Sequence, residues 1–246
     1  MSSTHIYIIS KTTTEDKMLF FKKLFSSWSL FEKIWISLFS ASAVFISIRS
    51  EDSLLGFIAF LTGVFCVVLT AKGSIISFLW GYPNILAYAW IAWQNGLYGE
   101  MGLNLLFFLP MNLIGHCLWH KNIHSSGKLE MRRLNLLHIC SGTLICAAAT
   151  LLLGWGLSHI NTQNTPYLDA LTNVLSVTAA LLLTFRYREQ WLCWIILDIF
   201  TIVMWAIRWY NGSNQGAIMV LMWSAYLVNA FWGWYNWSKH SRRKTI

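Results

Sequence analysis

Long apolar runs alternate with short charged or turn-forming segments along almost the whole chain. Eight runs are bounded by charged residues or by Gly and Asn turns, and they cover residues 34–48, 53–71, 74–94, 101–120, 134–157, 167–185, 190–209 and 214–237. Most are long enough to cross a hydrocarbon layer of roughly 30 Å, where the backbone has to satisfy its own hydrogen bonds. The pattern therefore predicts an all-α, polytopic membrane protein. The first run is the shortest, with fifteen residues between Lys33 and Arg49.

Composition supports lipid as the outer solvent of this protein. The chain is 56% hydrophobic and only 11% charged, which leaves too few polar side chains to cover a water-soluble core. The net charge of +8 lies in loops, without the basic stripe that a nucleic-acid partner requires. Residues 18–30 mix Phe, Leu and Trp with Lys, so we expect an amphipathic helix along the membrane surface. No small-residue cleavage site follows the N-terminal segment, which argues against a signal peptide.

The lysines and arginines predict the orientation in the membrane. If the N-terminus is cytoplasmic, sixteen of the eighteen fall in cytoplasmic segments and only Arg49 and Arg208 fall outside. This is the excess that the positive-inside rule describes. We therefore expect an even number of spans and cytoplasmic termini.

Landmarks recur in the same order in the two halves of the chain. Leu61-Thr62-Gly63-Val64 parallels Leu171-Thr172-Asn173-Val174, and the step from Trp80 to Asn84 parallels the step from Trp194 to Asp198. Because one crossing separates the halves, both would start on the same side of the membrane. This predicts a parallel duplication of three-helix bundles joined by a linker helix, a recurrent transporter architecture with its site at the repeat interface. The expected organisation is an N-terminal segment with an extra helix, two repeats separated by a loop and linker helix, and a basic tail, at residues 1–52, 53–120, 121–166, 167–237 and 238–246.

Asp198 is the one acidic residue near the centre of a predicted span, where a charged carboxylate costs about 2.5–3.5 kcal/mol. We interpret it as a substrate-binding group, with a structural pair to a neighbouring Asn or Trp as the alternative. Other polar side chains at membrane depth can donate and accept hydrogen bonds to a ligand, or hold helices together; they are Asn84, Gln94, Asn104, Asn112, Asn173 and Asn229.

Aromatic residues divide by depth. Trp155, Trp209 and Trp237 are predicted interface anchors, whereas Trp80 and Trp194 lie deeper and either stack on a planar ligand or pack in the core. Pro83 and Pro110 lie inside predicted spans and each should bend its helix.

His116, His120 and His124 recur every fourth residue and suggest a metal-dependent membrane enzyme as an alternative function. No further ligand cluster completes such a site, and the sequence contains no catalytic or nucleotide-binding fingerprint. The five cysteines lie in apolar runs without metal-site spacing. We therefore predict no enzyme activity, no metal and no cofactor.

The chain resembles the PnuC-type nicotinamide riboside transporters over about residues 53–237. The resemblance rests on Trp80-Gly-Tyr-Pro-Asn84, on Gln94 with Leu97-Tyr-Gly99, on Asn112-Leu-Ile-Gly115 with Trp119, and on Thr184-Phe-Arg-Tyr-Arg-Glu-Gln-Trp191 followed by Trp194. It implies a bacterial inner-membrane protein with a SWEET-like three-plus-one-plus-three helix fold.

The resemblance also implies a function and a site. The function is facilitated diffusion of nicotinamide riboside, with cytoplasmic phosphorylation trapping the product. By position, it implies a substrate pocket of Asn84, Gln94, Asn112, Trp191, Trp194 and Asn229, to which the residues themselves add Trp80 and Asp198. Another cationic aromatic vitamin such as thiamin is the alternative substrate. Small residues at 40–43 suit helix packing between protomers, so a homo-oligomer is expected, with a trimer as one candidate.

Overall fold

The computed structural model describes residues 28–49, 54–123, 129–159 and 166–243. The chain divides into two compact units, Met1–Leu38 and Phe39–Ile246. Helix α2, Leu30–Arg49, begins in the first unit and has 20 residues, which is longer than the run predicted for it. Its start is a capping box, because the Ser29 amide donates to Glu32 Oε2 at 2.7 Å and the Glu32 amide donates to Ser29 Oγ at 3.2 Å. The amphipathic segment predicted at 18–30 lies almost entirely outside the described residues.

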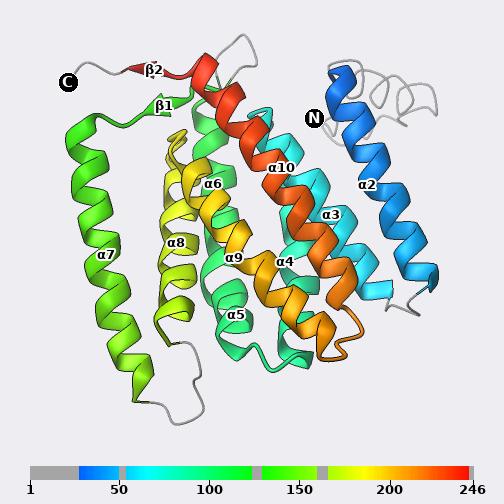
Figure 1. Cartoon of the computed structure of the whole chain (residues 1–246). Helices are drawn as coiled ribbons and strands as arrows, with labels where there is room; N and C mark the ends of the chain where they lie inside the picture. The colour runs from blue at the N-terminus through cyan, green and yellow to red at the C-terminus, as the bar shows by residue number, and fades with distance from the viewer. Residues whose placement is uncertain (1–27, 50–53, 124–128, 160–165, 244–246) are drawn as a thin grey trace, which may run out of the picture. The chain divides into compact units, whose positions relative to one another are not determined.

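Each of the other predicted runs corresponds to a helix or a continuous helical rod in the second unit (Figure 1). These elements are α3 Leu54–Ala71, α4 Ser77–Gln94, α5 Tyr98–Leu103, η1 Asn104–Phe108, α6 Leu109–Lys121, α7 Leu136–Ser158, α8 Pro166–Thr184, α9 Gln190–Tyr210 and α10 Gly216–His240.

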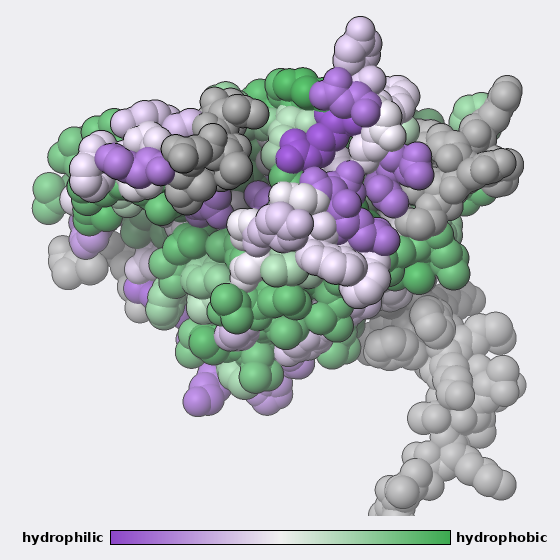
Figure 2. All heavy atoms as spheres, turned by 90° about the horizontal axis from the view of Figure 1, so that it is seen from below, coloured by the Kyte–Doolittle hydropathy of each residue, from purple (hydrophilic) through white to green (hydrophobic). Residues whose placement is uncertain are grey.

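Six of the described helical stretches are long and apolar enough to cross a membrane, namely α3, the rod from α5 to α6, α7, α8, α9 and α10. Helix α4 is not among them although it has 18 residues, because Tyr82, Pro83, Asn84 and Gln94 lower its hydropathy. Half of its residues are buried against neighbouring helices, where polar side chains find partners that lipid does not offer. Large hydrophobic side chains cover much of the surface that is visible in Figure 2.

The helices of the second unit pack in a closed order. Going round, α3 contacts α4, α4 contacts α6, α6 contacts α8, α8 contacts α9, α9 contacts α10, and α10 returns to α3. Helix α7 packs on α8, and among its residues only Gly154 is buried (Figure 1). A ring of six helical rods can enclose a cavity, whereas α7 lies outside that ring.

Turns at corresponding places in the two halves have the same geometry. After α3, the Gly73 amide donates to Thr70 O and the next amide donates back to Leu69 O. After α8, the Arg186 amide donates to Leu183 O and the next amide, that of Tyr187, donates back to Leu182 O. Both turn residues have positive φ, 69° at Gly73 and 66° at Arg186. Gly96 after α4 and Gly212 after α9 form a second pair, with φ of 70° and 91°.

Both prolines lie inside continuous helical rods, as predicted. Pro83 lies inside α4, and Pro110 lies in the first turn of α6 directly after the π-helical segment η1. Proline has no amide hydrogen, so the bond that an α-helix would make to the carbonyl of Leu106 is lost at this point. Such π segments widen the helix locally and are frequent at functional sites.

A short pair of strands was not predicted. Strand β1, Arg132–Arg133, pairs in parallel with β2, Arg242–Arg243, and joins the loop before α7 to the segment after α10. The expectation of a purely helical chain is therefore slightly wrong. Outside the bilayer, two extended segments can pair their backbones without disturbing the helical bundle.

Basic residues of the second unit gather at the end where α3, α6, α8 and α10 finish. Those at this end are Lys72, Lys121, Arg132, Arg133, Arg186, Arg188, Lys239, Arg242 and Arg243, whereas Arg208 lies in the last turn of α9 at the opposite end. Burial, and then the charge of Arg132, lowers the pKa of the Arg186 guanidinium, so cations at this end lie close together. We call this end the basic end.

Candidate functional site: a cavity inside the helix ring

A cavity of about 180 Å³ lies within the ring of six rods. Every rod of the ring contributes side chains to its wall, and none of its lining residues comes from α7. Apolar and aromatic side chains make up most of the lining, with a few polar groups among them, as in typical small-molecule sites.

Three asparagines on the cavity wall have a common arrangement. Asn84 donates from Nδ2 to Ala59 O, Asn112 to Phe78 O and Asn229 to Val67 O, each at 2.9 Å. Every one of these bonds joins two different helices. Because the NH₂ group is used in this way, the Oδ1 atom of each side chain remains an acceptor, and no donor to it is found among the described residues.

Asp198 is the most buried acidic group of the cavity wall, at 2% exposed. Within the described part of the chain its carboxylate has neither a hydrogen bond nor an ion pair. Tyr226 and Thr201 line the same cavity, and Thr201 donates to Leu197 O within α9 rather than to Asp198. A buried carboxylate without a protein partner is costly in its charged form unless a ligand compensates the charge.

Aromatic rings line the same cavity as Asp198. Trp194 is half-buried, and its indole lies 6.4 Å between ring centroids from Phe108 with the planes at 35°. Its Nε1 donates to Gln190 Oε1 at 3.4 Å, which holds the indole from within α9. Trp191, three residues earlier, is 2% exposed and packs on Gly233, where an added Cβ would lie 2.5 Å from Trp191 Cε2.

Six of the eight predicted site residues line the cavity, namely Asn84, Asn112, Trp191, Trp194, Asp198 and Asn229. Trp80 does not; it stacks on Phe65 with centroids 5.0 Å apart and is 36% exposed. Gln94, the last residue of α4, is exposed and also lies off the cavity.

Helical register explains why Trp80 lies off the cavity. Phe78 packs on Gly115 as Trp191 packs on Gly233. The counterpart of Trp191 is therefore Phe78, and not Ser77 as the pairing of Trp80 with Trp194 implied. With this offset the counterpart of Trp80 is Cys193. One residue turns a helix by about 100°, which is enough to move a side chain from the cavity to the outer face.

The structure adds cavity residues that the sequence interpretation did not select. Glu100, Tyr88 and Tyr226 line the cavity, and so do Ser176 and Thr201. Glu100 was missed because the predicted span began at residue 101, whereas α5 begins at Tyr98. Asn104, considered only as one of several polar groups, is 5% exposed and begins the π segment on the cavity wall.

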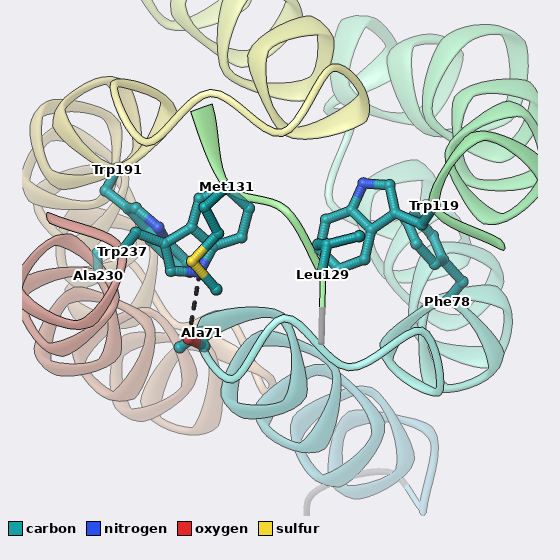
Figure 3. Close-up of a cluster of buried hydrophobic side chains, with 8 residues drawn as sticks. All are labelled: Ala71, Phe78, Trp119, Leu129, Met131, Trp191, Ala230 and Trp237. Carbon is teal, nitrogen blue, oxygen red and sulfur yellow. Dashed lines mark hydrogen bonds between the residues drawn. The ribbon is translucent and has the colours of Figure 1, made fainter. Parts of the chain in front are cut away.

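An apolar cluster closes the cavity toward the basic end (Figure 3). Phe78, Trp191 and Ala230 belong both to the cavity wall and to this cluster. Leu129 and Met131, from the segment before β1, lie against Trp119 and Trp237 on the far side (Figure 3).

Backbone and charge contacts hold that segment in place. The Arg132 amide donates to Arg186 O at 2.8 Å, and the Arg188 amide donates to Arg132 O at 3.0 Å. The Leu134 amide donates to Glu189 Oε2 at 3.1 Å, and Glu189 Oε1 pairs with Arg188 Nε at 3.1 Å. The segment on the basic side of the cavity is thus tied to the residues just before α9.

Corresponding tryptophans form hydrogen bonds across the two interfaces between the halves. Trp119 of α6 donates from Nε1 to Leu183 O of α8 at 3.1 Å, and Trp237 of α10 donates to Thr70 O and Ala71 O of α3 at 3.2 and 3.1 Å. Trp237 is therefore fully buried, and the prediction that it anchors at the membrane interface is wrong.

The histidine run does not form a metal centre in the described part of the chain. His116 stacks on Phe78 with ring centroids 5.9 Å apart, and His120 is exposed, while His124 lies outside the described residues. No group of three potential ligands comes together among the residues that the structure describes.

Comparison with known proteins gives one consistent result. A family model described as "Nicotinamide mononucleotide transporter" matches residues 53–239. The nicotinamide riboside transporter PnuC of Neisseria mucosa is 33% identical over 228 residues, covering 90% of this chain and 86% of that protein. The protein of the same name from Haemophilus influenzae is 34% identical over 221 residues, covering 89% and 94%.

A solved structure agrees with these sequence matches. The crystal structure of the vitamin B3 transporter PnuC superposes with a TM-score of 0.80 at 32% identity, covering 90% of this chain and 98% of that one. The matching proteins are transporters, so the interpretation of the histidine run as an enzyme centre is wrong. The chain is a multi-pass membrane protein and belongs to the PnuC family of nicotinamide riboside transporters.

Proposed function

We propose that this protein carries nicotinamide riboside across the bacterial inner membrane by uniport, and that cytoplasmic phosphorylation of the substrate drives net uptake. The observation that carries the proposal is the cavity, which combines an unpaired carboxylate at Asp198, the ring of Trp194 and three amide oxygens. The riboside is a cationic pyridinium ring with a carboxamide and a ribose. Each of its parts has a counterpart among these groups.

The aromatic pair offers a place for the pyridinium ring. Two stacking contacts of about 3.5 Å add to about 7 Å, close to the 6.4 Å between the centroids of Phe108 and Trp194. A planar ring would fit between them if the 35° angle between the rings narrowed and their separation grew slightly. A cation facing Trp194 gains a cation–π interaction of about 0.5–2 kcal/mol.

Charge favours the riboside over its phosphorylated form. The lining includes Asp198 and Glu100, but no Lys, Arg or His among the described residues. A phosphate would bring two negative charges into a cavity without a cation to pair with them, and buried unpaired charges are expensive. We therefore propose nicotinamide riboside, and not the mononucleotide in the family model's description, as the substrate.

The lining of the cavity also supports uniport, and the packing of the helices supports a duplicated topology. No hydrogen bond joins the Asp198 or Glu100 carboxylate to another ionisable side chain among the described residues, which supports uniport over proton coupling. We propose that the two sets of three rods, α3 to α6 and α8 to α10, are a SWEET-like parallel duplication with α7 as linker. The repeated turns and the paired Trp119 and Trp237 contacts support this arrangement. The basic end is then cytoplasmic, together with both termini.

The domain division and the assembly complete the proposal. We retain residues 53–120 and 167–237 as the repeats, 121–166 as loop and linker, and 1–52 and 238–246 as the flanking segments. The exposed hydrophobic side chains of α7, among them Leu144, Leu152 and Trp155, would face lipid or a neighbouring protomer of a homo-oligomer.

Uptake into liposomes tests the proposal. Purified protein should equilibrate labelled nicotinamide riboside across the bilayer without any ion gradient, and an enclosed riboside kinase with ATP should raise accumulation well above equilibrium. Unlabelled riboside should compete strongly, and thiamin weakly. Strict dependence on a proton or sodium gradient would refute uniport, and stronger competition by thiamin would change the substrate.

A further inference from the structure

Glu100 is an acidic residue of the cavity wall that the proposed binding of the substrate has not used. It lies in the first turn of α5, is half-buried, and its carboxylate makes neither a hydrogen bond nor an ion pair with any described residue. Its backbone oxygen accepts the Nδ2 group of Asn104 at 2.8 Å. This bond ties the backbone of Glu100 to the beginning of the π segment and leaves the carboxylate of Glu100 available.

Its position differs from that of Asp198. Helix α5 begins at the end opposite the basic end, away from the apolar cluster that closes the cavity. Asp198 lies in the middle of α9, deeper in the ring, and is also unpaired and 2% exposed. Glu100 therefore lies nearer than Asp198 to the end of the cavity opposite the apolar cluster.

Charges of both signs act on Glu100. Asp169, in the first turn of α8, and Arg208, in the last turn of α9, are the charged residues that act on it, and their signs are opposite. Arg208 forms no ion pair with Glu100 in the structure, so the carboxylate is not neutralised by contact. A low-dielectric wall concentrates such a field at the mouth of a cleft and raises the local concentration of oppositely charged solutes.

We propose that Glu100 is the outer cation-binding residue of the transport path. It captures the positively charged nucleoside at the mouth of the cavity and hands it to the Trp194 and Asp198 site, and it sets the preference for cationic over uncharged nucleosides. This role rests on the proposed function, because it needs a cationic substrate.

Calorimetry on purified protein tests the role with two ligands of nearly the same shape. Nicotinamide riboside carries a ring charge, and its reduced dihydronicotinamide form has the same ribose and carboxamide without that charge. For Glu100→Gln we expect affinity for the cation to fall about tenfold and affinity for the reduced form to change less than about twofold. The dependence of cation binding on salt should also become weaker.

Two variants act as controls. Glu100→Asp keeps the charge and should retain most of the affinity, which separates loss of charge from loss of fold. Asp169→Asn removes a negative charge at the same end but outside the cavity lining, and should change the affinity for the cation less than about twofold.

Three results would overturn the assignment: no effect of Glu100→Gln, equal weakening of both ligands, or the same effect from Asp169→Asn. Absence of nicotinamide riboside binding to the unaltered protein would instead overturn the proposed function itself, and the role of Glu100 with it.

Discussion

Replacing Trp194 with Ala should lower the affinity for nicotinamide riboside about a hundredfold, the largest effect that we expect from a single side chain. The substitution removes the ring that faces Phe108 across the cavity. It costs a cation–π interaction of about 2 kcal/mol and the apolar contact area of an indole on the pyridinium ring. Titration calorimetry in detergent measures the loss directly.

The matched control for this substitution is another tryptophan. Trp155 on α7 is 63% exposed and lies outside the helix ring, so Trp155→Ala should change the affinity less than about twofold. Trp194→Phe keeps an aromatic face and should recover most of the binding. Equal losses from Trp155→Ala and Trp194→Ala would mean that Trp194 supports the bundle rather than the ligand.

The second large effect is expected from Asp198→Asn, which keeps the shape of the side chain and removes its charge. The affinity for the cationic riboside should fall about thirtyfold, which corresponds to about 2 kcal/mol of lost attraction in a partly buried site. The reduced, uncharged riboside should bind nearly as before. Initial uptake rates below saturation should fall in the same proportion as binding.

Stability distinguishes a ligand-binding role of Asp198 from a structural one. Because no described residue pairs with its carboxylate, removing the charge relieves a desolvation cost and should leave the melting temperature unchanged or higher. A structural acceptor would behave in the opposite way. A marked fall in the melting temperature of Asp198→Asn would therefore contradict the ligand-binding role.

Hydropathy predicted the helices well because each run has to bury its backbone polar groups in lipid. The departures occur where tertiary contacts replace lipid as the environment. Helix α4 contains Asn84 and Pro83 and is still a complete helix, since Asn84 bonds to Ala59 O of α3. The π segment before Pro110 has no hydropathy signature at all, because it changes hydrogen-bond partners and not the apolar character of the residues.

The site was predictable where chemistry alone marked a residue. Asp198 and the asparagines are conspicuous in apolar runs, and the structure places Asp198, Asn84, Asn112 and Asn229 on one cavity. The choice between tryptophans depended on helical register, and an error of one residue in aligning the halves selected Trp80 beside Trp194. Glu100 required the exact start of α5, which hydropathy does not define to within one turn.

The closed end of the cavity could not be predicted. It depends on Leu129 and Met131, two apolar residues in a short loop segment, meeting Trp119 and Trp237 from helices far apart in the sequence (Figure 3). The contacts of Arg132 with the backbone of Arg186 and Arg188 are equally non-local. Such pairings arise from the packed arrangement and leave no periodic signal along the chain.

Competitive binding of nicotinamide riboside and nicotinamide mononucleotide to the purified protein tests the central claim most directly. A cavity with two carboxylates and no basic side chain in its described lining should bind the riboside at least a hundredfold more tightly than the phosphorylated form. Equal or tighter binding of the mononucleotide would contradict the claim that this cavity selects an unphosphorylated cation.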